Sequence, residues 1–424
     1  MKSRESLNGI DEENNLEEAL EPTPACCIYR VPEYIRKLNE DAYTPRLISI
    51  GPLHHGKKKL MGMENKKERC WSNFVERVDA RKVEEVKTYI AEEEKHIRDH
   101  YLVTSNLESA KYVKMVRYDA FFIIEFFTKN YRKNEDFFLK NPKMRYDLTN
   151  DLLLLENQLP YYVLNDLYTK AYPSTEGNPS FFALCLWFFK NWYNFNWSFS
   201  EQPKVEHLTD LLRQTLVKEV QLPVKPEEYI FDLPSATKLN ESGLKFRGTE
   251  NECFLALSLE KRKSRKWLPW FKVNEVRIPC LKIFDSTEIL FRNLMIFEVF
   301  HYPDQTHTCN YAILMDYLID TSKDVDLLIE KGIIANYVGD NEAIAKMFNK
   351  LCLDIMPGPS CYYGIAVKMK EHHDYPWNHM KATLIRVYFS NLWTGTATIA
   401  ATFLVILTLI QTVCSIMEVR QGYN

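Results

Sequence analysis

The longest uncharged segment of the sequence lies near its C-terminus, and it predicts a membrane-spanning helix. Between Arg386 and Glu418 there are 31 residues without a charge, and the most apolar part runs from Leu392 to Ile416. As a helix, these 25 residues extend about 37 Å, enough to cross a hydrocarbon layer of about 30 Å with some tilt. The alternative is a helix buried in the core of the protein, although core helices seldom run so long without a charge.

Two kinds of side chain characterise the predicted span, which we place at residues 390–416. The large apolar ones are Leu392, Trp393, Phe403, Leu404, Ile406, Leu407, Leu409 and Ile410. Small ones recur every four residues, with Thr394, Thr398 and Thr402 on one helical stripe. Because small residues let helices approach closely in lipid, this stripe favours self-association. The alternative is that each threonine bonds only to the backbone of its own helix.

The charges on either side of the span predict its orientation. Lys368, Lys370, Lys381 and Arg386 precede the span, whereas Arg420 alone follows it. Since basic residues favour the cytosolic side, we expect the body of the protein in the cytosol. Residues 417–424 form only a short tail, and the first residues lack an apolar signal segment, so we expect insertion after synthesis, as in tail-anchored proteins.

Two further features bear on the compartment of the body. The sequons Asn196-Trp-Ser198 and Asn240-Glu-Ser242 would be glycosylated only in a lumenal or extracellular body. The ten cysteines form no CxxC pair and their spacings do not recur, which favours reduced thiols in the cytosol. We therefore predict a single-pass membrane protein, at the plasma membrane, with a cytosolic body; a receptor-like extracellular body is the alternative.

Helical periodicity dominates the remainder of the chain. Apolar residues one or two helical turns apart predict an amphipathic helix, or a broken pair, between Glu64 and Tyr101. Asp147–Tyr168 is a second helical segment, which Pro160 breaks or kinks, and Ile344–Cys352 is a third. Short alternating stretches at Leu244–Phe246 and Val276–Ile278 predict the strands of a small hairpin.

These patterns give a mainly α fold, with a helical globular body, a small β element and one C-terminal transmembrane helix. We predict an acidic, disordered leader over residues 1–25 and one helical domain over 26–385, followed by the span and the tail. Hydrophobic residues make up 46% of the chain, which is ample for a large core. The formal net charge of −3 gives no overall attraction to nucleic acid, so we expect no nucleic-acid partner.

Known catalytic signatures are absent or incomplete. The sequence contains no GxGxxG, HExxH or GxSxG, so we predict no catalytic, cofactor or metal site. Gly51–Lys57 begins like a phosphate-binding loop, but Lys58 replaces the required Ser or Thr and Pro52 removes a backbone donor. Ser235-Ala-Thr-Lys238 fits SxxK without the companion motifs of that chemistry.

Seven polar residues lie within or beside apolar runs and must find partners if buried. They are Asp119 and Glu125 in YDAFFIIEFF, Glu156, Asn157 and Gln158 after Leu152–Leu155, and the adjacent His54 and His55. The interpretation that we favour is a structural polar network, because most buried carboxylates and amides pair internally. The alternative is the site of an unrecognised hydrolase or transferase, since burial also tunes general acids.

A basic segment followed by aromatic residues suggests contact with an anionic membrane surface. Its residues are Lys261, Arg262, Lys263, Arg265 and Lys266, followed by Trp267, Trp270 and Phe271. Each such charge contributes about 1 kcal/mol near an anionic leaflet. A solvated loop and a nuclear-import-like run are the alternatives.

Several long motifs resemble a known plant family. They include VPEYIRKLNEDAYTPRLISIGPLHHG at Val31–Gly56, YDAFFIIEFF at Tyr118–Phe127, LLLLENQLPYYVLNDLY at Leu152–Tyr168 and YFSNLWTGTATIAATFLVILTLIQT at Tyr388–Thr412. The chain is identified as similar to plant family of unknown function 247, also called uncharacterised protein family 0481. The resemblance implies a mainly helical protein with a C-terminal membrane span and no established enzymatic activity. Lys238 stands where this family usually has an acidic residue.

The function predicted from all of these features is that of a membrane-tethered, non-enzymatic interaction or signalling protein. Its expected partners are membrane lipid, through the C-terminal helix, and an unidentified protein. The resemblance adds that some relatives are associated with pollen–stigma self-incompatibility in grasses, which points to recognition.

Overall fold

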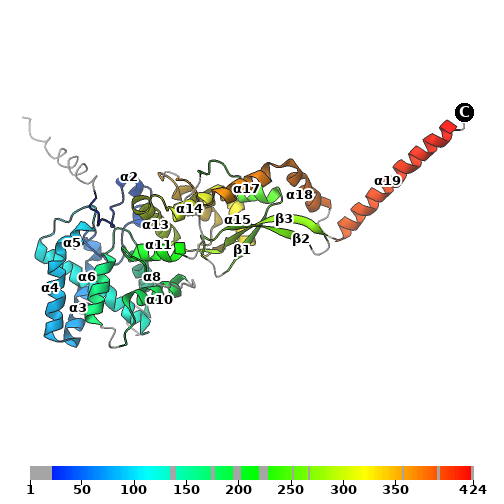
Figure 1. Cartoon of the computed structure of the whole chain (residues 1–424). Coiled ribbons are helices and arrows are strands. Elements are labelled where there is room, and N and C mark those ends of the chain that lie inside the picture. Colours follow the sequence, from blue (N-terminus) through cyan, green and yellow to red (C-terminus); the bar gives the residue numbers. More distant parts are fainter. Residues whose placement is uncertain are drawn as a thin grey trace, which may run out of the picture.

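The computed structural model (Figure 1) describes residues 22–133, 140–172, 177–193, 202–218, 228–250, 253–265, 268–355, 358–388 and 392–421. Within these ranges the protein has 17 α-helices and five strands, so the predicted mainly α fold is confirmed. The predicted leader lies almost entirely outside the described residues, as do Asn196, Lys266 and Trp267.

A long central helix organises the N-terminal half of the body. This helix, α6 (Ser109–Tyr131), is apolar on nearly all sides between Asp119 and Thr128 and is buried there. Its neighbours are α3 (Glu64–Arg77), α4 (Ala80–Glu92), α5 (Glu94–Asp99), α9 (Tyr161–Ala171) and α10 (Phe181–Tyr193). A helix that is hydrophobic all round must be surrounded by others, which explains its central place.

The segment predicted as one helix or a broken pair between Glu64 and Tyr101 forms three helices. The chain leaves α3 at Val78, and Asp79 then caps α4, where its carboxylate accepts a hydrogen bond from the backbone N–H of Lys82 at 2.8 Å. Such a cap satisfies a donor that the first helical turn leaves free. The stripe itself is confirmed, because Trp71, Phe74 and Ile90 are buried.

The segment Asp147–Tyr168 is broken at the predicted proline. Helix α8 (Pro142–Asp151) ends before an irregular stretch, residues 152–160, which we call the connector. Pro160 is the N-cap of α9, so it starts a second helix and does not kink a single one. The third predicted helix is confirmed as α16 (Asn341–Leu351), with Ile344, Phe348 and Leu351 buried.

The C-terminal half of the body contains the small β element. Strands β1 (Lys245–Thr249), β3 (Leu268–Pro279) and β2 (Ser258–Arg265) form one sheet in this order, and β4 (Leu281–Ile283) pairs with β5 (Ile334–Asn336). The two stretches predicted as a hairpin do pair, with Phe246 opposite Val276, but β1 and β3 are parallel. The hairpin prediction was therefore wrong. Strand β2, which lies between β1 and β3 in the sequence, forms the hairpin with β3.

Further helices complete the body. They are α2 (Glu33–Arg36), α11 (Leu208–Lys218), α12 (Ala236–Glu241), α13 (Thr287–His301), α14 (His307–Leu318), α15 (Ser322–Glu330), α17 (Tyr363–Asp374) and α18 (Pro376–Tyr388). A 3-10 turn at Glu40–Ala42 contacts α13, and another at Lys58–Met63 contacts α3 in the N-terminal half. One hydrophobic cluster runs through both halves of the body, from Cys27 to Met369.

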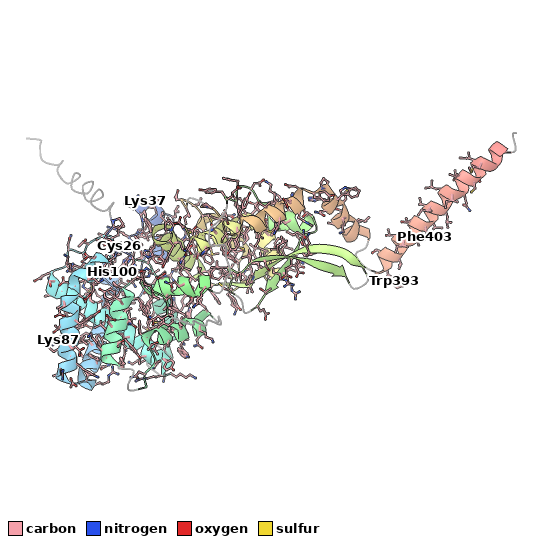
Figure 2. The ribbon with its side chains drawn as sticks, viewed as in Figure 1. Cys26, Lys37, Lys87, His100, Trp393 and Phe403 are labelled. Atoms are coloured by element: carbon pink, nitrogen blue, oxygen red, sulfur yellow. The ribbon has the colours of Figure 1, made fainter. Side chains whose placement is uncertain are left out.

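The last helix, α19 (Leu392–Gln421), does not pack into the body. Figure 1 shows it projecting away from the far end of the C-terminal half. Its segment Trp393–Met417 is long and apolar enough to span a membrane, and none of it is buried inside the protein. Figure 2 shows Trp393 and Phe403 pointing from α19 into open space. The alternative of a core helix is therefore wrong for this structure.

Candidate functional site

The predicted polar residues gather mainly around the connector, where it meets the N-terminal segment of the chain. Asp151, which the sequence analysis did not single out, lies at the start of this region. Its carboxylate accepts hydrogen bonds from the backbone N–H groups of Arg46, Leu47 and Ile48 at 2.8, 2.6 and 2.9 Å. One buried side chain thereby fixes three successive residues of a segment that has no regular secondary structure.

Asn157 and Gln158 continue this pattern with their side-chain amides. Asn157 Oδ1 accepts from the N–H of Ile50 at 2.7 Å, and its Nδ2 donates to the carbonyls of Ile48 and Asp151 at 3.1 and 2.9 Å. Gln158 Nε2 donates within the connector, and its Oε1 accepts from the N–H of Leu208 at 3.1 Å. Both side chains are 1% exposed, so their polar atoms are used entirely within the protein.

Glu156 is the second carboxylate of this network. One carboxylate oxygen accepts from the N–H of Val31 at 2.7 Å, and the other pairs with Arg36 and lies 3.2 Å from His54 Nε2. Burial would raise the pKa of Glu156, but the hydrogen bond to His54 and the charge of Arg36 hold it below its ordinary value. Burial lowers the pKa of His54. His55 is only half-buried, and its Nδ1 has no hydrogen-bond partner among the described residues.

Asp119 joins the same N-terminal segment from the central helix. Its carboxylate lies 2.7 Å from Lys67 Nζ and accepts the backbone N–H of Gly51 at 2.8 Å. Lys67 is fully buried and also contacts Glu64 at 2.6 Å. Burial alone would lower the pKa of Lys67, but these two carboxylates raise it, so the lysine stays charged.

The geometry at Gly51 excludes the phosphate-loop interpretation of this segment. Gly51 has a φ of +70°, and an added Cβ would lie 2.5 Å from the carbonyl oxygen of Gln158 and 2.8 Å from the hydroxyl of Tyr101. Its N–H, which such a loop would direct at phosphate, donates to Asp119. The glycine is required for close packing against the connector.

Glu125 is separate from this network. It lies farther along α6, where its carboxylate contacts Arg77 at 3.0 Å, Lys129 at 3.3 Å and Tyr172 at 3.4 Å. The structure thus brings Asp119, Glu156, Asn157 and Gln158 against residues 48–54, a segment that includes His54, and leaves Glu125 outside it.

A second buried network escaped the sequence analysis. Glu298, fully buried in α13, accepts from Arg213 Nε at 3.1 Å and from the N–H groups of Thr308 and Cys309 at 2.8 and 3.1 Å. Nearby, Asn293 accepts from the N–H of Leu155 at 2.9 Å, which ties α13 to the connector. In the sequence, this network could have been recognised because Asn293 and Glu298 are polar residues inside the apolar run TEILFRNLMIFE.

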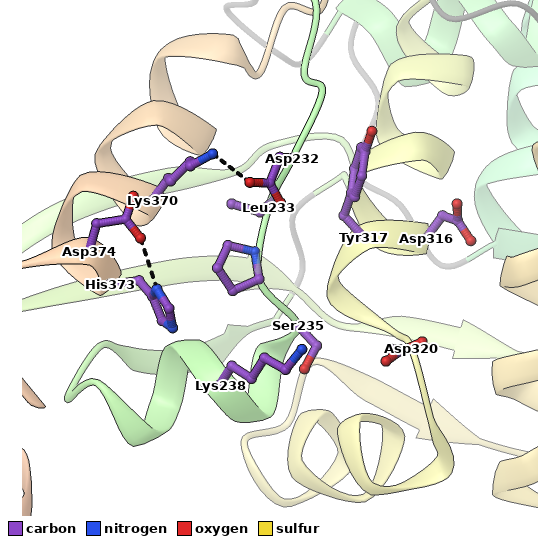
Figure 3. Close-up of a pocket in the computed structure, with 11 residues that line it drawn as sticks. Asp232, Leu233, Ser235, Lys238, Asp316, Tyr317, Asp320, Lys370, His373 and Asp374 are labelled. Carbon is purple, nitrogen blue, oxygen red and sulfur yellow. Dashed lines mark hydrogen bonds and ion pairs between the residues drawn. The ribbon is translucent and has the colours of Figure 1, made fainter.

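An open pocket of about 430 Å³ lies elsewhere, in the C-terminal half (Figure 3). It is lined by Asp232, Leu233, Pro234, Ser235, Lys238, Asp316, Tyr317, Asp320, Lys370, His373 and Asp374. Polar side chains pair within it: Lys370 Nζ lies 2.6 Å from the Asp232 carboxylate, and His373 Nδ1 lies 3.1 Å from that of Asp374. Burial and the neighbouring Asp320 raise the pKa of Asp316 to about 6.

The SxxK residues border this pocket, but the serine has a structural partner. Burial would raise the pKa of Asp324, but hydrogen bonds from Thr237 and Ser235 hold it below its ordinary value. Asp324 also forms the capping box of α15 with Thr321. Within the described part of the chain, no group of three or more His, Cys, Asp or Glu residues is placed to hold a metal ion.

Comparisons with known proteins agree on one family. The family model described as "Plant protein of unknown function", DUF247, matches residues 28–407. The UPF0481 protein At3g47200 of Arabidopsis thaliana is 28% identical over 428 residues, which cover 93% of this chain and 87% of that protein. The putative UPF0481 protein At3g02645 of the same plant is 20% identical, over 96% of this chain and 92% of its own length. No solved structure matches. With this match over nearly its whole length, the chain belongs to the DUF247 family of plant proteins of unknown function.

Proposed function

We propose that this protein is a membrane-tethered, non-enzymatic interaction protein, anchored by α19 and with its body in the cytosol. The observation that carries the proposal is an apolar 25-residue helical segment, Trp393–Met417, that the body of the protein leaves uncovered. An apolar helix of this length is stable in water only if something covers it, and acyl chains match its length and its lack of charge.

The arrangement of the polar candidates supports a non-enzymatic role. Glu156, Asp119 and Asn157 are at most 4% exposed, and their polar atoms hold backbone groups and charges of the same chain. The open pocket is lined by other residues. A hydrolase or transferase site built from the predicted residues would need an opening through which substrate reaches them.

The surroundings of Asn240 support a cytosolic body. Asn240 lies in the last turn of α12, and Ser242 of the same sequon is fully buried. A glycan acceptor must be accessible on a surface loop.

The proposal is tested by expressing the full chain and separating membranes from soluble protein. We expect the protein in the membrane pellet, retained after alkaline carbonate and released by detergent. In sealed right-side-out vesicles the body should be protected from added protease, and glycosidase should leave its mass unchanged. Recovery of the full chain in the soluble fraction would overturn the tether, and a protease-accessible, glycosylated body would overturn the orientation.

A further inference from the structure

Helix α18 presents four large apolar side chains outward. Its side chains Trp377, Met380, Leu384 and Val387 are 64, 60, 49 and 54% exposed. At 3.6 residues per turn these four positions fall within about 80° of the helix circumference, and we call them the α18 stripe. An exposed, continuous apolar stripe on a helix indicates a surface that is covered by something else.

The opposite face of α18 is the one that holds the helix to the body. Asn378 Nδ2 donates to the carbonyl of His372 at 2.8 Å, and His379 Nε2 lies 2.8 Å from the carbonyl of His373. Ala382 packs closely on Gly243, where an added Cβ would lie 3.2 Å from that of the alanine. The usual arrangement of an amphipathic surface helix, with the apolar face inward, is thus reversed.

We propose that the α18 stripe is a membrane-docking surface that lies in the interface of the same bilayer that α19 crosses. This inference rests on the proposed function, because it takes α19 as the span. The occupant that we assign to the stripe is therefore lipid.

Chain connectivity places the stripe beside the bilayer. Helix α18 ends at Tyr388 and α19 begins at Leu392. Four consecutive Cα steps reach at most about 15 Å. If Leu392 enters the membrane, the end of α18 is therefore within this distance of the surface. A helix with an apolar face at this depth lies with that face about 5–10 Å into the headgroup and acyl boundary.

Charge near the same end of the body favours an anionic surface. The hairpin strands carry Lys261, Arg262, Lys263 and Arg265 on β2 and Lys272 on β3, and residues 261–265 and 268–273 include no acidic residue. Figure 1 shows that the end of the hairpin at which β2 finishes and β3 begins is directed toward the end of the body from which α19 leaves. Basic residues at this position suit phosphatidylserine-rich leaflets.

The test measures how deeply α18 lies in lipid. Full-length protein with a genetically encoded fluorescent amino acid at position 384, 406 or 61 is reconstituted into vesicles of phosphatidylcholine with roughly one-third phosphatidylserine, brominated on their acyl chains. Met61 is 51% exposed on a 3-10 turn in the N-terminal half and serves as the matched surface control. We expect strong quenching at 406, intermediate quenching at 384 and none at 61.

The outcomes separate the two proposals. Quenching at 406 with none at 384 overturns the docking surface and leaves the tether intact, whereas no quenching at 406 overturns the tether itself. Self-quenching at 384 that depends on protein concentration, without quenching by lipid, assigns the stripe to a second copy and also overturns the inference.

A pair of substitutions tests the stripe without altering the span. Met380→Glu should lower bromine quenching at 384 roughly threefold, because a charge is expelled from the acyl boundary. Met61→Glu, the same change at a similarly exposed site, should leave it unchanged. Equal quenching in both variants would contradict the docking surface.

Discussion

The connector and the two C-terminal helices, α18 and α19, differ in which side chains they expose to solvent. In the connector, polar side chains are buried: Glu156, Asn157 and Gln158 are 4, 1 and 1% exposed. In the helices, apolar side chains are exposed: Trp377 and Phe403 are both 64% exposed. The first region uses its hydrogen-bonding groups within the chain, whereas the second leaves apolar surface that the chain does not cover.

This difference separates folding from association. A buried amide or carboxylate is tolerated only where its partners are fixed, so the connector and residues 31–51 specify one another. Exposed apolar surface needs no fixed hydrogen-bond partner within the chain. Its unfavourable free energy of contact with water is removed only when a partner outside the chain covers it. The connector thus stabilises the fold of its own chain, whereas the apolar surface of α18 and α19 is available to partners outside the chain.

The largest effect should come from breaking the buried ion pair beside the connector. Lys67→Met leaves Asp119 as an uncompensated buried charge, and removal of one partner of such a pair costs about 3–5 kcal/mol in the free energy of unfolding. The measurement is urea unfolding of the full chain in detergent, followed by tryptophan fluorescence.

The matched control for this variant is Lys87→Met. Lys87 is 42% exposed and lies 3.4 Å from Glu84, and exposed pairs contribute at most about 1 kcal/mol. If both variants unfold at the same urea concentration, the buried pair adds nothing to stability and the comparison fails.

The next effect should follow from adding one methyl group at Gly51. Gly51→Ala places a Cβ 2.5 Å from Gln158 O on a backbone with φ of +70°. Backbone strain and the steric shift together should cost about 2–4 kcal/mol. Gly56→Ala has a φ of +80° and nothing within 4 Å, so only the strain of about 1–2 kcal/mol applies. If both variants lose the same free energy of unfolding, the steric contact of residue 51 with the connector adds nothing to the cost.

A smaller effect is expected on acidification. Burial lowers the pKa of His207 from 6.5 to about 3, and its Nδ1 accepts the N–H of Asp210 at 3.2 Å. Above pH 6.5 the ring is neutral in both states, so its contribution is fully present. As pH falls toward 3, only the unfolded chain binds the proton, and stability is lost by about 1.4 kcal/mol per unit, or about 2 kcal/mol by pH 5.

The variant His207→Gln tests this assignment. Between pH 6.5 and 5, the slope of the unfolding free energy against pH should decrease by up to about 1.4 kcal/mol per pH unit, which corresponds to one proton. The variant will also be less stable than the unmodified chain at pH 7. A slope identical to that of the unmodified chain would place the acid sensitivity elsewhere, for example at His307, whose pKa burial lowers to about 4.

The smallest effect is expected in the α18 stripe. Leu384→Ala in detergent should change the free energy of unfolding by less than about 0.5 kcal/mol, because the side chain is 49% exposed and surface changes are usually this small. Leu164→Ala, at a fully buried leucine of α9, should cost about 2–5 kcal/mol. Similar losses at both positions would mean that Leu384 is part of the core.

Much of the helical body was predictable because its signal is local. The stripe of Ile344, Phe348 and Leu351 repeats at helical spacing, and Pro160 lacks the N–H that a helix interior needs. The connector was predictable only in part. Glu156, Asn157 and Gln158 stand in an apolar region and must be bonded, but their partners Val31, Ile50 and Leu208 lie 50 to 125 residues away in the chain.

The parallel pairing of β1 with β3 shows the same limit. Alternation identifies Leu244–Phe246 and Val276–Ile278 as strands, but it carries no information about which strands are neighbours in the sheet or in which direction they run. Strand pairing depends on contacts distant in sequence, so the hairpin was the wrong choice between two topologies of similar local pattern.

The sequence by itself determined that residues 392–416 are too apolar and too long for an ordinary surface helix, because composition and length are properties of the segment alone. Only the tertiary structure decided that this helix stays outside the body, that Asp119 and Glu156 are used by the fold, and that α18 turns its apolar side outward. Periodicity shows that a helix has an apolar face. The elements packed around it decide whether that face is buried.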